Sequence, residues 1–249
     1  KSGAQRMAAA GAMDVADYFM AQHVDPAMPV GTIGISAGPC SGGVDNWYGV
    51  IKGKGGHGAH PDQTIDPFHL LAHVILGLNG IVSRRINPFE PAVVSIGMVN
   101  GGFTENVIPD QVKLSGTLRF ANPDIHEPLR EEIKRAFEIA RTMGGDYELR
   151  FEYGGPPMIN DKTVSDVIEA TGKEMLGTDN VHEIGKTLGA EDFSVFLEMA
   201  PGAMFTLGTQ KKGHEEYMLH HPKFDLDERA LPIGTAMLAE TAKRFLKGE

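Results

Sequence analysis

The chain has 249 residues, of which 41% are hydrophobic and 22% are charged, and this balance is typical of a globular protein rather than a disordered or fibrous one. Its net charge is −10 and no run of Lys or Arg exceeds two residues, which excludes an extended cationic surface for nucleic acid. The apolar stretches are too short to span a bilayer and the single cysteine, Cys40, cannot form an intrachain disulfide, so we expect a cytoplasmic protein without a membrane partner.

The first 43 residues predict one helix and two short strands. The helix covers residues 2–12, and the strands at 18–23 and 31–36 are almost continuously apolar. Strands of this kind usually lie in a sheet that is covered on both faces. The beginning of the chain is therefore typical of an α/β domain.

The middle of the chain, residues 44–157, predicts six elements in the order strand, helix, strand, strand, helix, strand. This is the order of a ferredoxin-like α+β fold. Asp66 is a good helix N-cap, and Pro67 suits the first helical position. The predicted strands cover residues 47–54, 92–99, 111–120 and 147–153, and the predicted helices cover 66–85 and 129–140.

The last part of the chain returns to alternating helices and apolar strands. We predict helices at 164–176, 191–199 and 228–247 and a strand at 203–208. Residues 1–43 and 158–249 are therefore assigned to one α/β domain, and residues 44–157 to an insert within it.

Two histidines of the α/β domain are candidate metal ligands. His23 stands at the end of a predicted strand, where open sheets commonly place their sites, although a lone histidine is more often a core residue. His220 is followed by a second histidine and lies close to Asp225 and Asp227, a set of residue types that suits zinc or manganese. An ordinary surface-loop histidine is an equally good explanation of His220.

Glu191 and Asp192 stand at the start of a predicted helix. Acidic side chains there cap free backbone N–H groups, and capping alone explains the pair. The functional alternative is that Glu191 faces a cleft and holds a ligand or water in place.

Three residues of the insert are candidates for substrate contacts. His57 is enclosed by glycines, which suits an imidazole projecting from a flexible rim, or an incidental turn. Asn106 and Arg119 belong to one predicted hairpin and could converge on an anionic group, because Arg offers a planar fork that fits a carboxylate. A solvated strand Arg is the commoner case.

Five motifs follow one another along the chain. They are Gln22-His23-Val24-Asp25-Pro26, Lys52-Gly53-Lys54-Gly55-Gly56-His57-Gly58-Ala59, Asn106-Val107-Ile108-Pro109-Asp110, Gly189-Ala190-Glu191-Asp192-Phe193 and Leu219-His220-His221-Pro222. In this order the chain resembles the amidohydrolase branch of the aminoacylase and carboxypeptidase metallopeptidases. Hippurate hydrolases, N-acyl-amino-acid amidohydrolases and auxin-conjugate hydrolases belong to that branch.

The resemblance implies a catalytic α/β domain of the phosphorylase/hydrolase-like type, with residues 44–157 forming a ferredoxin-like domain through which a homodimer assembles. It implies two divalent ions, zinc or manganese, with His23 a ligand of one and His220 a ligand of the other. The ions would bridge a water and polarise the scissile amide.

The resemblance also implies roles for the remaining candidates. His57 would reach the active site of the partner subunit and stabilise the oxyanion, and Asn106 and Arg119 would hold the substrate carboxylate. The expected substrates are N-acyl-amino acids or small peptides that end in a free carboxylate. A true aminopeptidase is disfavoured, because Arg119 suits a carboxylate better than an amine.

The chain departs from the family pattern in one respect. The family carries a Cys-Gly-His-Asp metal motif and a Glu-Glu pair with the general base, and neither stands upstream of His23. Glu215-Glu216 lies in the loop before His220 and does not replace that pair. We therefore expect a fragment that lacks part of the metal site and is inactive alone. The alternative is an inactive dimeric scaffold or a protein that binds acyl-amino acids.

Overall fold

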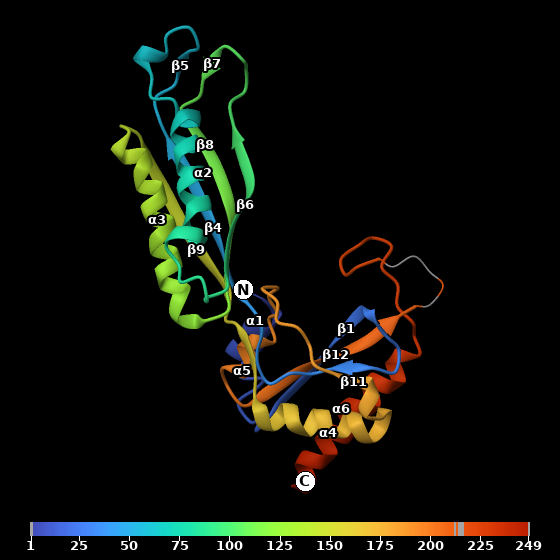
Figure 1. The fold of residues 1–249 in the computed structure, drawn as a ribbon. Coiled ribbons are helices and arrows are strands. Elements are labelled where there is room, and N and C mark those ends of the chain that lie inside the picture. The colour runs from blue at the N-terminus through green and yellow to red at the C-terminus, as the bar shows by residue number, and fades with distance from the viewer. Residues whose placement is uncertain (1, 212, 214–216, 249) are drawn as a thin grey trace. The chain divides into compact units, whose positions relative to one another are not determined.

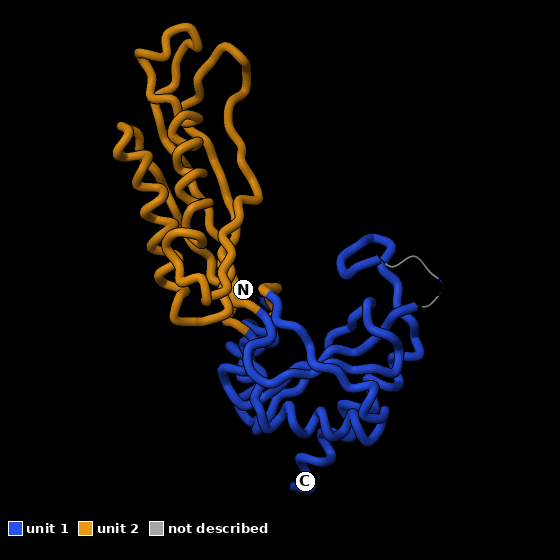
Figure 2. The backbone as a smooth tube through the Cα atoms, viewed as in Figure 1, with its two compact units in different colours: residues 1–41, 158–187, 192–249 blue, residues 42–157, 188–191 orange. Residues whose placement is uncertain are grey.

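The computed structural model describes residues 2–211, 213 and 217–248 and divides the chain into two compact units of mixed α/β structure (Figure 2). Unit 1 comprises residues 1–41, 158–187 and 192–249, and unit 2 comprises residues 42–157 and 188–191. The sequence assigned residues 188–191 to the other domain. They join unit 2 because the Gly42 amide donates a hydrogen bond to the Gly189 carbonyl at 2.8 Å, a long-range contact that has no local sequence signal.

Unit 2 is built on a four-stranded antiparallel sheet with the strand order β6-β8-β4-β9. Helices α2 and α3 pack against each other and against this sheet (Figure 1). The main elements are β4 (Gly43–Lys52), α2 (Pro67–Arg84), β6 (Ala92–Gly101), β8 (Gln111–Phe120), α3 (His126–Thr142) and β9 (Asp146–Gly155). Short elements are β5 (Gly56–His57), η1 (Pro61–Gln63), β7 (Val107–Ile108) and η2 (Pro123–Ile125). The predicted order of strands and helices is observed, and the strand order is that of the ferredoxin-like fold.

The core of unit 2 follows from the alternation along β4, in which every second residue is buried. Trp47 from β4 is fully buried and meets Phe137 from α3 edge to face, with ring centroids 6.0 Å apart. Gly49 lies two residues further on the same face, and a Cβ atom there would come within 2.4 Å of the Phe137 ring. The helix and the strand therefore approach each other as closely as they do because this position is glycine.

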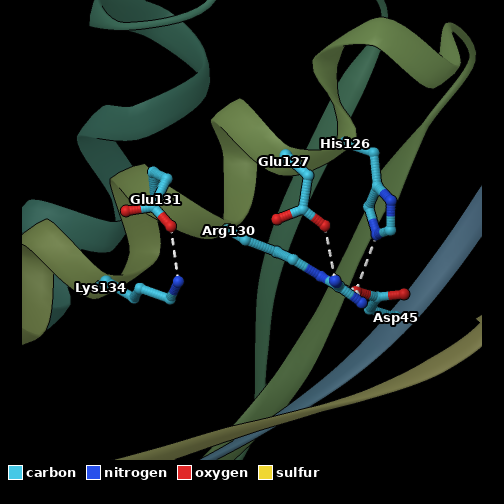
Figure 3. A network of polar contacts seen from close by, with 6 residues as sticks. All are labelled: Asp45, His126, Glu127, Arg130, Glu131 and Lys134. Atoms are coloured by element: carbon cyan, nitrogen blue, oxygen red, sulfur yellow. Dashed lines mark hydrogen bonds and ion pairs between the residues drawn. The ribbon is translucent and has the colours of Figure 1, made fainter.

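A buried carboxylate near the start of β4 ties the sheet to helix α3 (Figure 3). Asp45 is 0% exposed, and its Oδ2 accepts hydrogen bonds from Arg130 Nε at 2.6 Å and from His126 Nε2 at 2.9 Å. Arg130 Nη1 also donates to Glu127 on the same helix. Burial alone lowers the pKa of Arg130, but its hydrogen bonds and ion pairs with Asp45 and Glu127 together outweigh burial, so that the pKa is raised.

Unit 1 contains a four-stranded mixed sheet with the strand order β1-β12-β2-β11, in which β1 and β12 are parallel. A two-stranded ladder joins β3 and β10. The strands are β1 (Phe19–Pro29), β2 (Ile33–Gly34), β3 (Gly38–Ser41), β10 (Met158–Asn160), β11 (Val181–His182) and β12 (Gly202–Gln210). The helices are α1 (Gly3–Ala9), α4 (Lys162–Leu176), η3 (Thr178–Asn180), α5 (Ser194–Leu197) and α6 (Ala230–Lys247).

The two faces of strand β12 belong to different apolar clusters. Phe205 and Leu207 pack with residues of α4 and α6, whereas Met204 packs on the opposite face with Cys40 and Phe193. Strand β12 is thus buried on both sides, as its continuous apolar sequence predicts. Strand β1 at the edge of the sheet is only half-buried over most of its length.

Four predicted elements of unit 1 differ from the observed ones by four residues or more in length. Helix α1 ends at Ala9 and not at 12, β1 extends six residues beyond the predicted end at 23, β2 keeps only two of the residues predicted for 31–36, and α5 is a single turn. The long helices α2 and α6 have 18 residues each and exposed positions along them. In the described part of the chain, no helix is long and apolar enough to cross a membrane.

The Asp45 cluster generates a stability prediction. Asp45→Ala is expected to lower the free energy of unfolding by roughly 3 kcal/mol, because it leaves Arg130 and His126 partly buried without their carboxylate. Urea denaturation of the purified variant measures this change. The matched control is Glu131→Ala, which removes the exposed ion pair with Lys134 and should cost about 0.5 kcal/mol or less. Equal losses in the two variants would show that the cluster is not a structural tie.

Candidate functional site

The orientation of the His23 ring leaves one nitrogen available to a ligand. Nδ1 lies 2.9 Å from the Val24 carbonyl oxygen, which can only accept a hydrogen bond, so Nδ1 carries the proton in the neutral ring. The other nitrogen, Nε2, then has a free lone pair. A backbone carbonyl that fixes the tautomer in this way is the usual support of a metal-binding histidine.

His23 lies within strand β1 and not at its end, which corrects the sequence-based expectation. Pairing with β12 continues from His23 opposite Thr206 to Asp25 opposite Gly208 and, after a bulge, to Pro29 opposite Gln210. The prolines after His23 do not end the strand, because β1 is an edge strand and a proline there need not donate to a second neighbour.

His220 has an exposed side chain and a backbone φ of 69°. This left-handed conformation is uncommon for a residue other than glycine, and such residues cluster at functional sites. The carboxylates that follow it pair with cations: Asp225 with Lys211 and Asp227 with Arg229. Glu215 and Glu216 lie outside the described residues.

The two histidines do not by themselves complete a metal site. Among residues 2–211, 213 and 217–248, no group of three or more His, Cys, Asp or Glu side chains is arranged to hold an ion. Two ions with three or more protein ligands each need more donors than His23 and His220 provide. The residues present therefore do not fit a complete two-ion centre.

His57 and Asn106 come together at one end of unit 2, where the short strands β5 and β7 pair (Figure 1). The Gly58 amide donates to the Asn106 carbonyl at 2.8 Å. His57 Nδ1 accepts a hydrogen bond from the Ala59 amide at 3.1 Å, so the neutral ring carries its proton on Nε2. The exposed His57 side chain thus offers a donor to a carbonyl oxygen or an anion.

One glycine before His57 allows two segments to approach closely. A Cβ atom on Gly55 would lie 2.6 Å from the Ile108 carbonyl oxygen. Glycine is therefore needed at this position, next to the start of β5 and opposite β7.

Arg119 lies at the opposite end of the sheet from Asn106. Arg119 lies eight positions after Gln111, the first residue of β8, which corresponds to roughly 26 Å. Arg119 Nη1 donates to the Leu188 carbonyl at 3.0 Å, which leaves further N–H donors of the guanidinium available. The expected convergence of Asn106 and Arg119 within one hairpin is therefore wrong for a single chain.

Glu191 and Asp192 do not cap a helix. Helix α5 begins at Ser194, its N-cap is Phe193, and no side chain caps it. The Asp192 carboxylate instead accepts a hydrogen bond from the Ala4 amide at 3.0 Å, which attaches the start of α1. Glu191 is half-buried in the 188–191 segment of unit 2.

Unit 1 also contains a cavity of about 430 Å³ that no sequence motif predicts. Its lining comes from β1, β3, β10, β12 and the segment 182–187. These parts are far apart in the sequence, so no local motif marks them. The only trace in the sequence is the presence of methionine and cysteine at buried strand positions, which packing alone explains equally well.

The sequence profile of the peptidase family M20/M25/M40 matches residues 1–244. N-acetylcysteine deacetylase of Bacillus subtilis is 38% identical over 243 residues, which cover 97% of this chain and 62% of that protein. Thermostable carboxypeptidase 1 of Saccharolobus solfataricus is 34% identical over 247 residues, which cover 98% of this chain and 62% of that protein.

Among solved structures, the Bacillus subtilis YXEP protein, a dinuclear metal binding peptidase from the M20 family, is similar with a TM-score of 0.80 and 33% sequence identity. The match covers 99% of this chain and 62% of that one. The chain thus spans about three-fifths of the length of the relatives it matches.

The segment after His220 generates a pH prediction. The hydrogen bond from Arg229 lowers the pKa of Asp227 to about 2 from its ordinary value of 3.8. Because the folded-state pKa is lowered, the stabilisation by this pair is fully present above pH 3.8 and is lost as the pH falls through about 2. Asp227→Asn should therefore lower the melting temperature at pH 7, and the difference from the wild type should vanish near pH 2.

Thermal unfolding followed by circular dichroism between pH 7 and pH 2 measures the effect. Arg229→Gln removes the donor and should reproduce the loss at pH 7. A difference between Asp227→Asn and the wild type that stays constant down to pH 2 would contradict the assigned pair.

Proposed function

Because this chain belongs to the peptidase family M20/M25/M40, we propose that it is the larger part of an enzyme that hydrolyses the amide bond of N-acyl-amino acids or of small peptides with a free carboxylate. The observation that carries the proposal is the match along almost the whole chain to a deacetylase and a carboxypeptidase. The substrates in those two names share an amide bond next to a free carboxylate. The available N–H donors of the Arg119 guanidinium suit this carboxylate.

We propose further that the active site is shared between two copies of the chain. His57 and Asn106 lie beyond the Gln111 end of β8, whereas Arg119 lies near the other end, roughly 26 Å from Gln111, and a small acyl-amino acid cannot span that distance. A site that uses all three residues therefore needs His57 and Asn106 from unit 2 of one copy and Arg119 from unit 2 of a second copy.

The edge strand β6 supports an assembly through residues 44–157. Met98 and Val99 are exposed on its second half, although both are apolar. An exposed apolar edge strand is a ready pairing surface. Pairing of two β6 strands would form a homodimer around a twofold axis.

In this proposal each residue has a defined task. His57 of the partner subunit donates its Nε2 proton in a hydrogen bond to the carbonyl oxygen of the scissile amide as negative charge develops there. Arg119 pairs with the free carboxylate of the substrate, and the side-chain amide of Asn106 helps to hold the same carboxylate. Glu191 supports the site from the 188–191 segment beside Arg119, whose guanidinium already bonds to Leu188.

The metal centre of the complete enzyme is proposed to hold two divalent ions, zinc or manganese, with His23 and His220 as one ligand each. The remaining metal ligands and the general base would come from a segment that corresponds to the part of the relatives that this chain does not match. The free Nε2 of His23 and the left-handed backbone at His220 support these two assignments. A non-catalytic dimeric scaffold or acyl-amino-acid-binding protein is not favoured, because the relatives are hydrolases.

The shared site predicts complementation between two inactive variants of the complete protein. His57→Ala and Arg119→Ala should each lower kcat/KM for an N-acyl-amino acid by about 100-fold or more, since each removes a charge-stabilising or charge-pairing donor. Mixing the two variants under conditions that exchange subunits should restore about a quarter of the wild-type activity, because half of the dimers then carry one intact site.

The control for this experiment is a mixture of His57→Ala with Asn106→Ala. Both residues lie at the same tip, so no mixed dimer has an intact site and no recovery is expected. Recovery in this control, or none with Arg119→Ala, would refute the arrangement.

The proposed metal centre predicts different behaviour for the short and the extended protein. The 249-residue chain should not hydrolyse N-acetyl or N-benzoyl amino acids, whereas the protein extended to the relatives' full length should do so and lose activity to a chelator. Turnover by the 249-residue chain alone that a chelator blocks would contradict the proposal that ligands are missing from it.

A further inference from the structure

Two histidines lie one turn apart on helix α2 of unit 2 (Figure 1). His69 and His73 are both exposed, and their ring centroids lie 5.0 Å apart. Residues four apart in an α-helix are neighbours on one face, which brings the two imidazoles together. Because both side chains are exposed, packing in the core does not account for them.

The nitrogen atoms of both rings are available to a ligand. Within the part of the chain that the structure describes, neither ring makes a hydrogen bond or an ion pair, and each contacts the other ring. A neutral imidazole has one nitrogen with a lone pair, so the two rings offer two nitrogen donors. In His57, by contrast, Nδ1 already accepts a hydrogen bond from the Ala59 amide.

The distance between the rings is the distance that a shared metal ion requires. An ion bound by two imidazole nitrogens at about 2.1 Å in near-tetrahedral geometry holds the ring centroids roughly 5 Å apart. The observed rings stand edge to face, with 83° between their planes. The χ2 torsion of histidine has a broad minimum, so a rotation of each ring can direct one nitrogen to a common point.

Helix α2 holds the two histidines on a rigid support. It has 18 residues and begins after Asp66, whose carboxylate caps the first turn. Leu70 and Val74 are buried on the opposite side of the helix, so the backbone between His69 and His73 is fixed by the core. A chelating pair on a fixed element loses less conformational entropy on binding than a pair on a loop.

The charges near the two histidines do not oppose a cation. Helix α2 has no charged residue between Pro67 and Ser83. The neighbouring helix α3 carries four cationic side chains, and each is held in an ion pair with a carboxylate: Arg130, Lys134, Arg135 and Arg141. An ion at His69 and His73 therefore meets no unpaired Lys or Arg on either helix.

The donor set selects the class of ion. Among the described residues, no third His, Cys, Asp or Glu side chain completes a metal-binding group, so water would fill the remaining coordination positions. Two imidazole nitrogens suit zinc, copper and nickel. Magnesium and calcium are excluded, because these ions require oxygen ligands. Two histidines at this spacing on one helix face also form the zinc-binding element of helical metalloenzyme motifs.

We propose that His69 and His73 bind one divalent transition-metal ion of the zinc, copper or nickel class, with both imidazoles as ligands. This site is separate from His23 and His220, which lie in unit 1, and it does not depend on the hydrolysis proposed above. The ion bridges one turn of α2 and stabilises the helix that packs against the sheet of unit 2. With two protein ligands it exchanges with solvent, unlike a structural zinc ion that has four.

The site can be tested by titrating the 249-residue chain, labelled with ¹⁵N in its histidine rings, with Zn²⁺ at pH 7.5. Single His→Gln variants assign the ring signals. The signals of His69 and His73 should shift together with one midpoint, because one ion binds both rings. Mg²⁺ at the same concentrations should leave both signals unchanged.

The matched control moves one histidine along the helix. The double variant His69→Ala, Ala72→His keeps the amino-acid composition and uses an exposed position. Adjacent helix residues point about 100° apart and do not face each other, so the zinc affinity of this helix should fall at least about tenfold. His69→Gln should show the same loss. Zinc should also raise the melting temperature of the parent protein more than that of either variant.

Three results would overturn the proposed site. These are separate zinc midpoints for His69 and His73, equal zinc affinity of the parent helix and the double variant, and equal shifts with Mg²⁺ and Zn²⁺. Equal affinity would mean that single histidines bind zinc independently. Circular dichroism without metal should be the same for all three proteins, and the His69→Gln result decides the test if the double variant does not fold.

Discussion

The parallel pairing of β1 with β12 is the constraint on which the candidate site of unit 1 depends. It aligns His23 with Thr206 and continues past them, so the histidine is held within a ladder and not on a loose loop. It also divides the side chains between two faces. Phe205 and Leu207 pack with the helices, and His23 shares the other face with Met204, whose cluster includes Cys40. The contacts that bury the strand therefore also orient the imidazole.

In unit 2 the length of the sheet sets the distance between the candidate substrate-binding residues. A strand of ten residues keeps its two ends far apart, and β8 has His57 and Asn106 beyond one end and Arg119 near the other. Long paired strands do not fold back on themselves. The separation is therefore a rigid property of the unit, and a site shared by two copies is the simplest way to use both ends.

The Asp45 cluster lies at the same end of the sheet as Arg119. Asp45 and Val44 are neighbours on β4, and Val44 pairs with Arg119 on β8. The buried ion pair with Arg130 holds this end of the strand against helix α3. A buried carboxylate is costly unless it is paired, so its presence ties the conformation of the strand to that of the helix. The position of Arg119 is set by the same part of the core.

The sequence by itself determined the order of elements in residues 44–157, because alternating and helical apolar patterns, the Asp66 N-cap and the turn residues are local signals. It also identified the family, because five motifs in order are far more specific than any one of them. Only the tertiary structure decided which residues meet. The length of β1, the opposite placement of Asn106 and Arg119, the inclusion of residues 188–191 in unit 2 and the cavity of unit 1 all depend on contacts between segments distant in the chain. Such contacts arise from packing and strand register, which no short stretch of sequence encodes.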